Sequence, residues 1–236
     1  MQHRYYTLVA SLPRLPRIEE AERLPINRER LDQRLRMLRP EDAAVIARAE
    51  GFLTWRSQPG GQTDADIVRA TKEILDSPRL HPAVRDLVEF RMELRTIVAA
   101  LRRRRRGESA PTGNDWGISR WMEHIRRNWQ HPDFKLSNVF PWVPEAREQL
   151  EKGESVGLER LLMQVMWNFL DGLAFGHEFD VVNVLTYVMK WDILKRWLSQ
   201  DPADARARFD ELVAEAMAGR MGGNAAKEPK AGAIAE

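Results

Sequence analysis

The chain has 236 residues, of which 43% are hydrophobic and 31% charged, and its formal net charge at pH 7 is +2. This length allows one large domain or two small ones with a hydrophobic core, and no apolar stretch reaches the roughly 18 residues that a membrane-spanning helix needs. Cysteine is absent, which excludes disulfides, thiolate metal sites and cysteine nucleophiles. We expect no signal peptide and a cytoplasmic location.

Charge is unevenly distributed along the chain. Residues 102–135 carry nine basic and four acidic side chains, whereas residues 136–236 carry eleven basic and sixteen acidic ones. Such polarity suits a protein held between differently charged partners. An ordinary solvated surface is the alternative interpretation.

The N-terminal half is expected to begin with an extended segment and to continue as helices. Residues 5–13 are rich in β-forming side chains, which favours a short strand or an extended arm, with a helix as an alternative. Prolines at positions 13, 16 and 25 then keep the chain extended. Asn27 predicts the cap of a first helix, and Pro40, followed by two acids, predicts the start of the next one.

Two further helices are predicted before the middle of the chain, over residues 64–76 and from Pro82 to Gly107. Residues 108–113 have the composition of a linker or hinge. They divide the chain into an N-terminal helical half, residues 1–107, and a C-terminal helical half, residues 114–219. Residues 220–236 are rich in Gly, Ala and Lys, and we expect a disordered tail.

The C-terminal half is predicted to contain helices over residues 118–129, 144–150 and 156–170, the first of them capped by Asp115. Residues 179–198 form the most clearly marked helix, because apolar side chains surround most of its circumference and it must be buried on more than one face. Another helix is expected after Asp201. The sequence therefore predicts an all-α fold of helical hairpins and bundles, arranged in two sub-bundles.

Patterns that carry chemistry are weak in this sequence. It contains no phosphate-binding glycine motif and no His-Glu-x-x-His pair. His177, Glu178 and Asp180 cluster in a way that suggests a metal, although capping of the following helix explains them as well. We therefore predict no catalytic residue, no metal and no cofactor, and a protein that is not an enzyme.

Arg102–Arg106 is the longest run of charge. It suggests docking of an anionic partner or nucleic acid, but cations also favour a helix C-terminus, and the run lacks interleaved aromatic residues. Trp116 and Trp142 lie near the ends of predicted elements. They are candidates for exposed anchors of a partner, with a place in the core as the alternative.

Two segments resemble a known family. The opening Tyr5-Tyr6-Thr7-Leu8-Val9-Ala10-Ser11-Leu12-Pro13 resembles the Tyr-Tyr-x-Leu-Val-Ala-x-Leu-Pro start of an uncharacterised bacterial family. Residues 179–213 are similar to the C-terminal pattern of that family, which has an aliphatic helix, a tyrosine (Tyr187), a basic residue (Lys190) and an Arg-Trp pair (Arg196-Trp197) before an acidic turn. Members are typically encoded among the subunits of bacterial V/A-type rotary ATPases.

The resemblance implies a non-catalytic structural subunit of such an ATPase, analogous to the C (eukaryotic d) subunit that joins the central stalk to the membrane rotor ring. Its partners would be the central stalk and the ring, its location would be peripheral to the inner membrane face, and no direct contact with nucleic acid is expected. A free-standing helical adaptor or nucleic-acid-binding protein that uses Arg102–Arg106 is the alternative. The candidate interface residues are Tyr5, Tyr6, Arg102, Arg103, Arg104, Arg105, Arg106, Trp116, Trp142 and Arg196.

Overall fold

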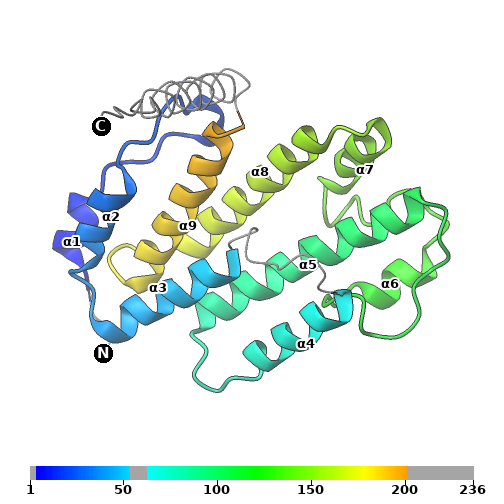
Figure 1. The fold of residues 1–236 in the computed structure, drawn as a ribbon, viewed down its shortest axis with the longest axis horizontal. Helices are drawn as coiled ribbons and strands as arrows, with labels where there is room; N and C mark the ends of the chain where they lie inside the picture. The colour runs from blue at the N-terminus through cyan, green and yellow to red at the C-terminus, as the bar shows by residue number, and fades with distance from the viewer. Residues whose placement is uncertain (1–3, 54–62, 201–236) are drawn as a thin grey trace, which may run out of the picture.

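The computed structural model describes residues 4–53 and 63–200, and within these ranges it confirms the all-α fold (Figure 1). Helices and short turns account for all of the regular structure there, and neither range contains a strand. The elements are α1 (Tyr6–Ser11), a 3-10 turn (Ile18–Glu20), α2 (Arg28–Leu35), α3 (Pro40–Leu53), α4 (Asp64–Leu75), α5 (Pro82–Arg105), α6 (Met122–Arg127), α7 (Val143–Lys152), α8 (Ser155–Ala174) and α9 (Val181–Leu198). None of these helices is long and apolar enough to cross a membrane. The helix predicted after Asp201 and the tail 220–236 lie outside the described residues.

The expectation of a strand or an extended arm at the N-terminus is wrong, and the helical alternative is correct, because residues 6–11 form α1. Tertiary contacts outweigh the β propensity of these residues. Tyr5 is buried, its backbone N–H donates to the carbonyl oxygen of Phe179 at 2.5 Å, and its hydroxyl bonds to Asp42. Leu8 is also buried in the core. The segment between α1 and α2 is mostly non-helical, as its prolines predict.

Several helices begin where their capping residues predict. The side chain of Asn27 accepts a hydrogen bond from the backbone N–H of Arg30 at 2.9 Å. Thr63 and Asp66 form a reciprocal capping box at the start of α4. Pro40 and Pro82 are the first residues of α3 and α5, where a missing N–H costs no helical hydrogen bond.

The helix predicted over residues 118–129 is shorter than expected, because only Met122–Arg127 is helical. Asp115 does not cap it, since Trp121 occupies the N-cap position. The apolar side chains of this region instead anchor a series of turns, in which Phe134 has no exposed surface and a positive φ of 54°. The apolar pattern of residues 118–129 thus marks a buried segment that is only partly helical, since burial alone does not distinguish turns from a helix.

The long helices share one hydrophobic core. A single cluster of buried side chains takes residues from α1, α3, α5, α7, α8 and α9, and it also includes the turns between α6 and α7. Figure 1 shows α5, α8 and α9 as the main rods of the molecule, with α3 lying beside α9. The core is therefore continuous across residues 108–113. The division into halves there remains a prediction.

Helix α9 is buried on several faces, as its sequence predicts. Val184, Leu185 and Trp191 are each at most 1% exposed. The helix packs against α8 and α3, and the N-terminal segment covers a further side. That segment is held by two side chains of α9, because the hydroxyl of Tyr187 donates to the carbonyl oxygen of Pro13 at 2.8 Å and the indole of Trp191 donates to that of Ile26 at 2.8 Å.

Asp192 makes the stability of this helix packing dependent on pH. Burial raises the pKa of this carboxyl from 3.8 to about 6; Glu50 and Asp32 raise it further, and Arg28 and Lys195 oppose the shift. The folded state thus binds the proton more tightly than the unfolded state does, so the stabilisation from protonation is present below about pH 4 and is lost as the pH rises to about 6.

We expect Asp192→Asn to remove this dependence. The free energy of unfolding of the variant minus that of the parent should grow as the pH rises from 4 to 7, because only the parent then carries a poorly solvated charge. Urea unfolding of both proteins at several pH values measures the difference. A difference that stays constant from pH 4 to 7 would contradict the expectation.

Candidate binding surface at the end of helix α5

The five arginines of residues 102–106 have different environments in the structure. Arg103 pairs with Asp64 of α4 at 2.9 Å. Arg104 donates from Nε to the carbonyl oxygen of Trp129 at 3.1 Å and therefore ties α5 to the turn after α6. Arg106 pairs with Glu108 at 2.5 Å on the surface. Among the described residues, no carboxylate lies within ion-pairing distance of Arg102 or Arg105.

Helix α5 ends on its own backbone hydrogen bonds, so the arginines are not needed as caps. Gly107 adopts a left-handed conformation with φ of 74°, and its N–H donates to the carbonyl oxygen of Arg104 at 2.9 Å. The N–H of Glu108 donates to the carbonyl oxygen of Arg103 at 3.1 Å. This arrangement satisfies the last carbonyls of the helix. The arginine side chains are therefore left to contact neighbouring elements or solvent.

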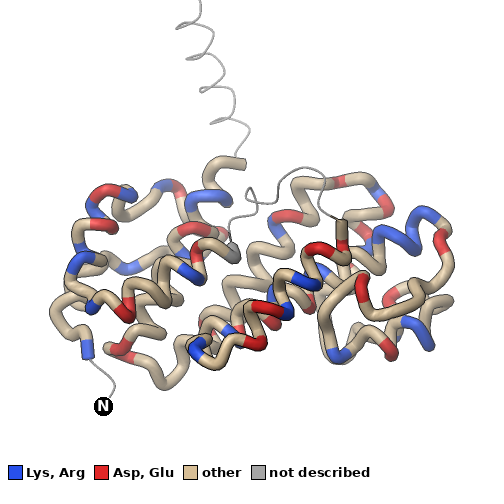
Figure 2. Tube along the Cα trace, turned by 60° about the horizontal axis from the view of Figure 1, so that its bottom comes forward, with Lys and Arg blue, Asp and Glu red and all other residues tan. Residues whose placement is uncertain are grey.

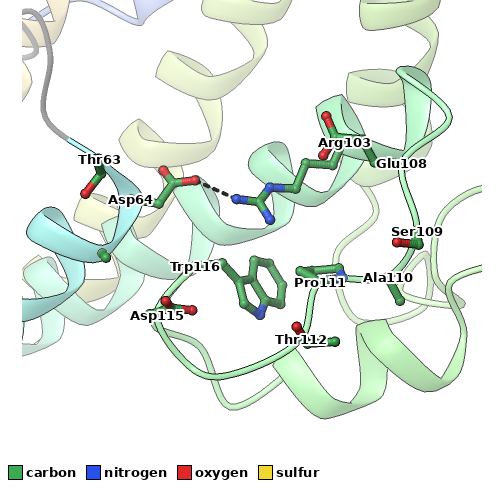
Figure 3. Close-up of a pocket in the computed structure, with 11 residues that line it drawn as sticks. Thr63, Asp64, Arg103, Glu108, Ser109, Ala110, Pro111, Thr112, Asp115 and Trp116 are labelled. Carbon is green, nitrogen blue, oxygen red and sulfur yellow. Dashed lines mark hydrogen bonds and ion pairs between the residues drawn. The ribbon is translucent and has the colours of Figure 1, made fainter.

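One cleft of about 650 Å³ lies between the start of α4, the end of α5 and the loop that follows it (Figure 3). Asp64 organises one wall, because its carboxylate accepts from both Arg103 and Arg95, the latter at 2.8 Å. The cleft is lined by Thr63, Asp64, Ala65, Arg103, Glu108, Ser109, Ala110, Pro111, Thr112, Asp115 and Trp116.

Trp116 and Trp142 are core residues, so the interpretation of both as exposed anchors is wrong. Their exposed fractions are 4% and 9%. Trp116 nevertheless lines the α4–α5 cleft, and its indole lies in Figure 3 between the Asp64–Arg103 pair and the loop carrying Thr112. Its buried Nε1 has no hydrogen-bond partner among residues 4–53 and 63–200. Leaving a buried donor without an acceptor lowers the stability of the fold by about 1–3 kcal/mol. An acceptor that enters the cleft and bonds to this N–H would therefore be favoured.

A second cleft, of about 470 Å³, lies between the end of α5 and the turn from α7 to α8. We call it the arginine cleft. Three basic side chains and two buried leucines, Leu150 and Leu158, contribute to it. Its lining residues are Arg102, Arg105, Arg106, Gln149, Leu150, Gly153, Glu154, Ser155 and Leu158.

Loss of solvent and nearby positive charges both act on Arg102 in this cleft. The pKa of Arg102 is lowered, first by removal of solvent around the guanidinium and then by the positive charges of Arg95 and Arg106. Arg102 is exposed overall, but it lines the cleft, so part of its side chain is shielded from solvent. Arginine remains charged at neutral pH despite such a shift. The cleft therefore presents uncompensated positive charge.

The remaining candidate interface residues do not join this surface. Tyr5 is buried, whereas Tyr6 is 51% exposed and its ring centroid lies 4.7 Å from that of Phe179, two residues before α9. Arg196, near the end of α9, pairs with Glu159 of α8. Figure 1 places α1 at the opposite end of the molecule from α6 and α7. Basic and acidic residues are interspersed along most of the trace in Figure 2, so the candidates form no common face of one charge.

The cluster around His177 has a capping role, as one of the two sequence interpretations predicts. The carboxylate of Asp180 accepts from the N–H groups of Val182 and Asn183, at 2.9 and 3.2 Å, and it also contacts Nδ1 of His177 at 2.6 Å. Within residues 4–53 and 63–200, no three histidine or acidic side chains come together in a way that would hold a metal ion.

The fold and this surface define an all-helical protein with one main core and two clefts beside the end of its longest helix. The chain belongs to the family described as "Protein of unknown function (DUF2764)", whose sequence profile matches residues 82–219, more than half of the chain. The match includes all residues that line the arginine cleft, but only part of those that line the α4–α5 cleft. No curated protein and no solved structure matches the chain.

Proposed function

We propose that this protein is a non-catalytic structural subunit of a bacterial V/A-type rotary ATPase, which joins the central stalk to the membrane rotor ring. The proposal starts from the resemblance of residues 5–13 and 179–213 to a family encoded with such ATPases. The observation that carries it physically is the single core shared by α5, α8 and α9. A connector between two moving parts must transmit force without bending, and closely packed helices with one core resist deformation.

The arrangement of α9 supports a rigid connector. Its contacts with α8, α3 and the N-terminal segment hold it on several sides, and Trp191 and Tyr187 fix that segment by hydrogen bonds. The two ends of the molecule also differ in chemistry. One end carries the exposed Tyr6 beside Phe179, and the other carries the arginine cleft. Different ends suit a protein that contacts two different partners.

The alternative, a nucleic-acid-binding protein that uses the whole arginine run, receives less support. Arg103 and Arg104 are engaged with Asp64 and with the backbone of Trp129, so they are not available to neutralise phosphates. Trp116 and Trp129, two of the aromatic residues that follow the run in sequence, are buried and offer no stacking platform.

Affinity purification of the tagged full chain tests the proposal. The chain is expressed in its own host, cells are gently cross-linked in the presence of nucleotide, and membranes are solubilised in mild detergent. We expect central-stalk and ring subunits of the rotary ATPase in amounts comparable to the bait, and only background amounts with an unrelated tagged helical protein. Background recovery of ATPase subunits with the bait as well would refute the proposal.

A further inference from the structure

We propose that the arginine cleft binds an acidic segment of a partner protein, with carboxylates placed between Arg102, Arg105 and the first turn of α8. The identity of that partner as a subunit of the same complex rests on the function proposed above. The acidic chemistry of the ligand is argued from the cleft alone.

The charge of the cleft is unbalanced. Its lining has three arginines and one carboxylate, that of Glu154. Arg106 is paired with Glu108, whereas no described carboxylate forms an ion pair with Arg102 or Arg105. Two guanidinium groups thus converge on one cleft without a counter-charge, and each offers a planar fork of donors that matches a carboxylate.

The start of α8 adds to this positive potential. The helix is 20 residues long, its N-cap Glu154 makes no side-chain capping hydrogen bond, and its first turn contains no acid. The first N–H groups of a helix lack intrahelical acceptors and carry the positive end of the helix dipole, so they favour an anion. Ser155, the first residue of α8, lines the same cleft as the arginines.

Buried leucines strengthen the interaction of the cleft with a carboxylate. Leu150 and Leu158 line it and are 8% and 4% exposed. Charges attract more strongly beside an apolar wall than in open water, because the local dielectric constant is lower. The wall also offers contact to the methylene groups of a glutamate side chain. Gly153 adopts φ of 76° here, and its missing side chain leaves the cleft open beside Arg105.

A protein segment fits this cleft better than nucleic acid does. None of its lining residues is aromatic, so a base has no ring on which to stack. Its unpaired cations are two arginines, Arg102 and Arg105, and such a small number favours a short acidic motif over a long phosphate backbone.

Fluorescence anisotropy on the isolated full chain tests the proposal, with fluorescein-labelled hexaglutamate as the probe at low salt. We expect the triple variant Arg102→Gln, Arg105→Gln, Arg106→Gln to bind at least about tenfold more weakly than the parent. The matched control replaces Arg23, Arg30 and Arg36 by Gln. It removes the same charge from exposed positions before, on and directly after α2, and should change affinity less than about twofold.

A second variant separates binding from folding. Ser155→Glu places an acid in the first turn of α8, which favours the helix but competes for the arginines. Weaker probe binding with an unchanged or higher melting temperature would support the proposal. Equal loss in the triple variant and its control would overturn it, as would an absence of binding by the parent.

Labelled oligo-dT is the competing probe. If it binds more tightly than hexaglutamate and depends on the same three arginines, the acidic-protein proposal is wrong. These outcomes are independent of the purification test. Recovery of the ATPase subunits by the triple variant at parental levels, with no hexaglutamate binding by the parent, would refute only the cleft proposal. Probe binding without ATPase recovery would refute only the proposed function.

Discussion

Replacing Trp191 by alanine is expected to lower the free energy of unfolding by about 3–5 kcal/mol, the usual cost of removing a buried aromatic side chain. Trp191 is 1% exposed and forms a small core with Ile26, which lies just before α2, and with Leu31 of α2. Its indole N–H also donates to the carbonyl oxygen of Ile26, which would lose its partner. The substitution therefore removes both packing and a buried hydrogen bond.

Urea unfolding followed by far-ultraviolet circular dichroism measures this loss. Trp191→Phe is the graded control, because it keeps an aromatic ring and loses the hydrogen bond and part of the volume, so its cost should be clearly smaller than that of alanine. We also expect faster hydrogen exchange in residues 12–27 of the alanine variant, since these residues depend on α9 for their position. A loss below about 1 kcal/mol would show that the N-terminal segment does not need this anchor.

Much of the helical fold was predictable, because its signals are local. Asn27, Pro40 and Pro82 determine where helices begin through interactions within one turn, and each acts as predicted. Thr63 acts in the same local way at the start of α4. Tyr5–Ser11 was not predictable in the same way. Its helical conformation depends on burial against residues far along the chain, including Phe179, and no local pattern reports such contacts.

The candidate surface shows the same distinction. The sequence singles out Arg102–Arg106 but treats all five as equivalent. Their roles differ because they contact different partners that are distant in sequence. Asp64, which pairs with Arg103, lies 39 residues before it, and Trp129, whose carbonyl oxygen accepts from Arg104, lies 25 residues after it. Ser155 and Leu158, which complete the arginine cleft, are still further away in sequence. The indole N–H of Trp116, which meets no acceptor in the described part of the chain, had no sequence signal, since its position depends on the placement of a whole loop.

Replacing Gly117 by alanine is expected to destabilise the protein by about 2–4 kcal/mol, because no space exists for a methyl group. A Cβ atom at Gly117 would lie 2.5 Å from Cγ2 and 2.6 Å from Oγ1 of Thr96. Thr96 has no exposed surface and, as a β-branched residue in α5, cannot easily change its rotamer. Its hydroxyl accepts from the N–H of Ile118 at 3.0 Å and donates to the carbonyl oxygen of Met92 at 2.7 Å.

The clash would therefore disturb the contact that holds the loop after α5 against that helix, and with it Trp116 in the α4–α5 cleft. Gly172→Ala is the matched control. It makes the same substitution inside α8, where a Cβ meets nothing within 4 Å, and alanine should stabilise that helix by about 0.5–1 kcal/mol. Chemical unfolding should thus give effects of opposite sign for the two glycines.

A double mutant identifies the cause of the loss. Thr96→Ala removes Cγ2 and Oγ1, the two atoms closest to the new methyl group, so the Thr96→Ala, Gly117→Ala pair should cost less than the sum of the two single substitutions. Additive costs would show that contact with Thr96 is not the cause of the loss. Because Gly117 has no positive φ, that result would contradict the structural argument, whereas strong coupling would establish that the loop after α5 is positioned by direct contact with Thr96.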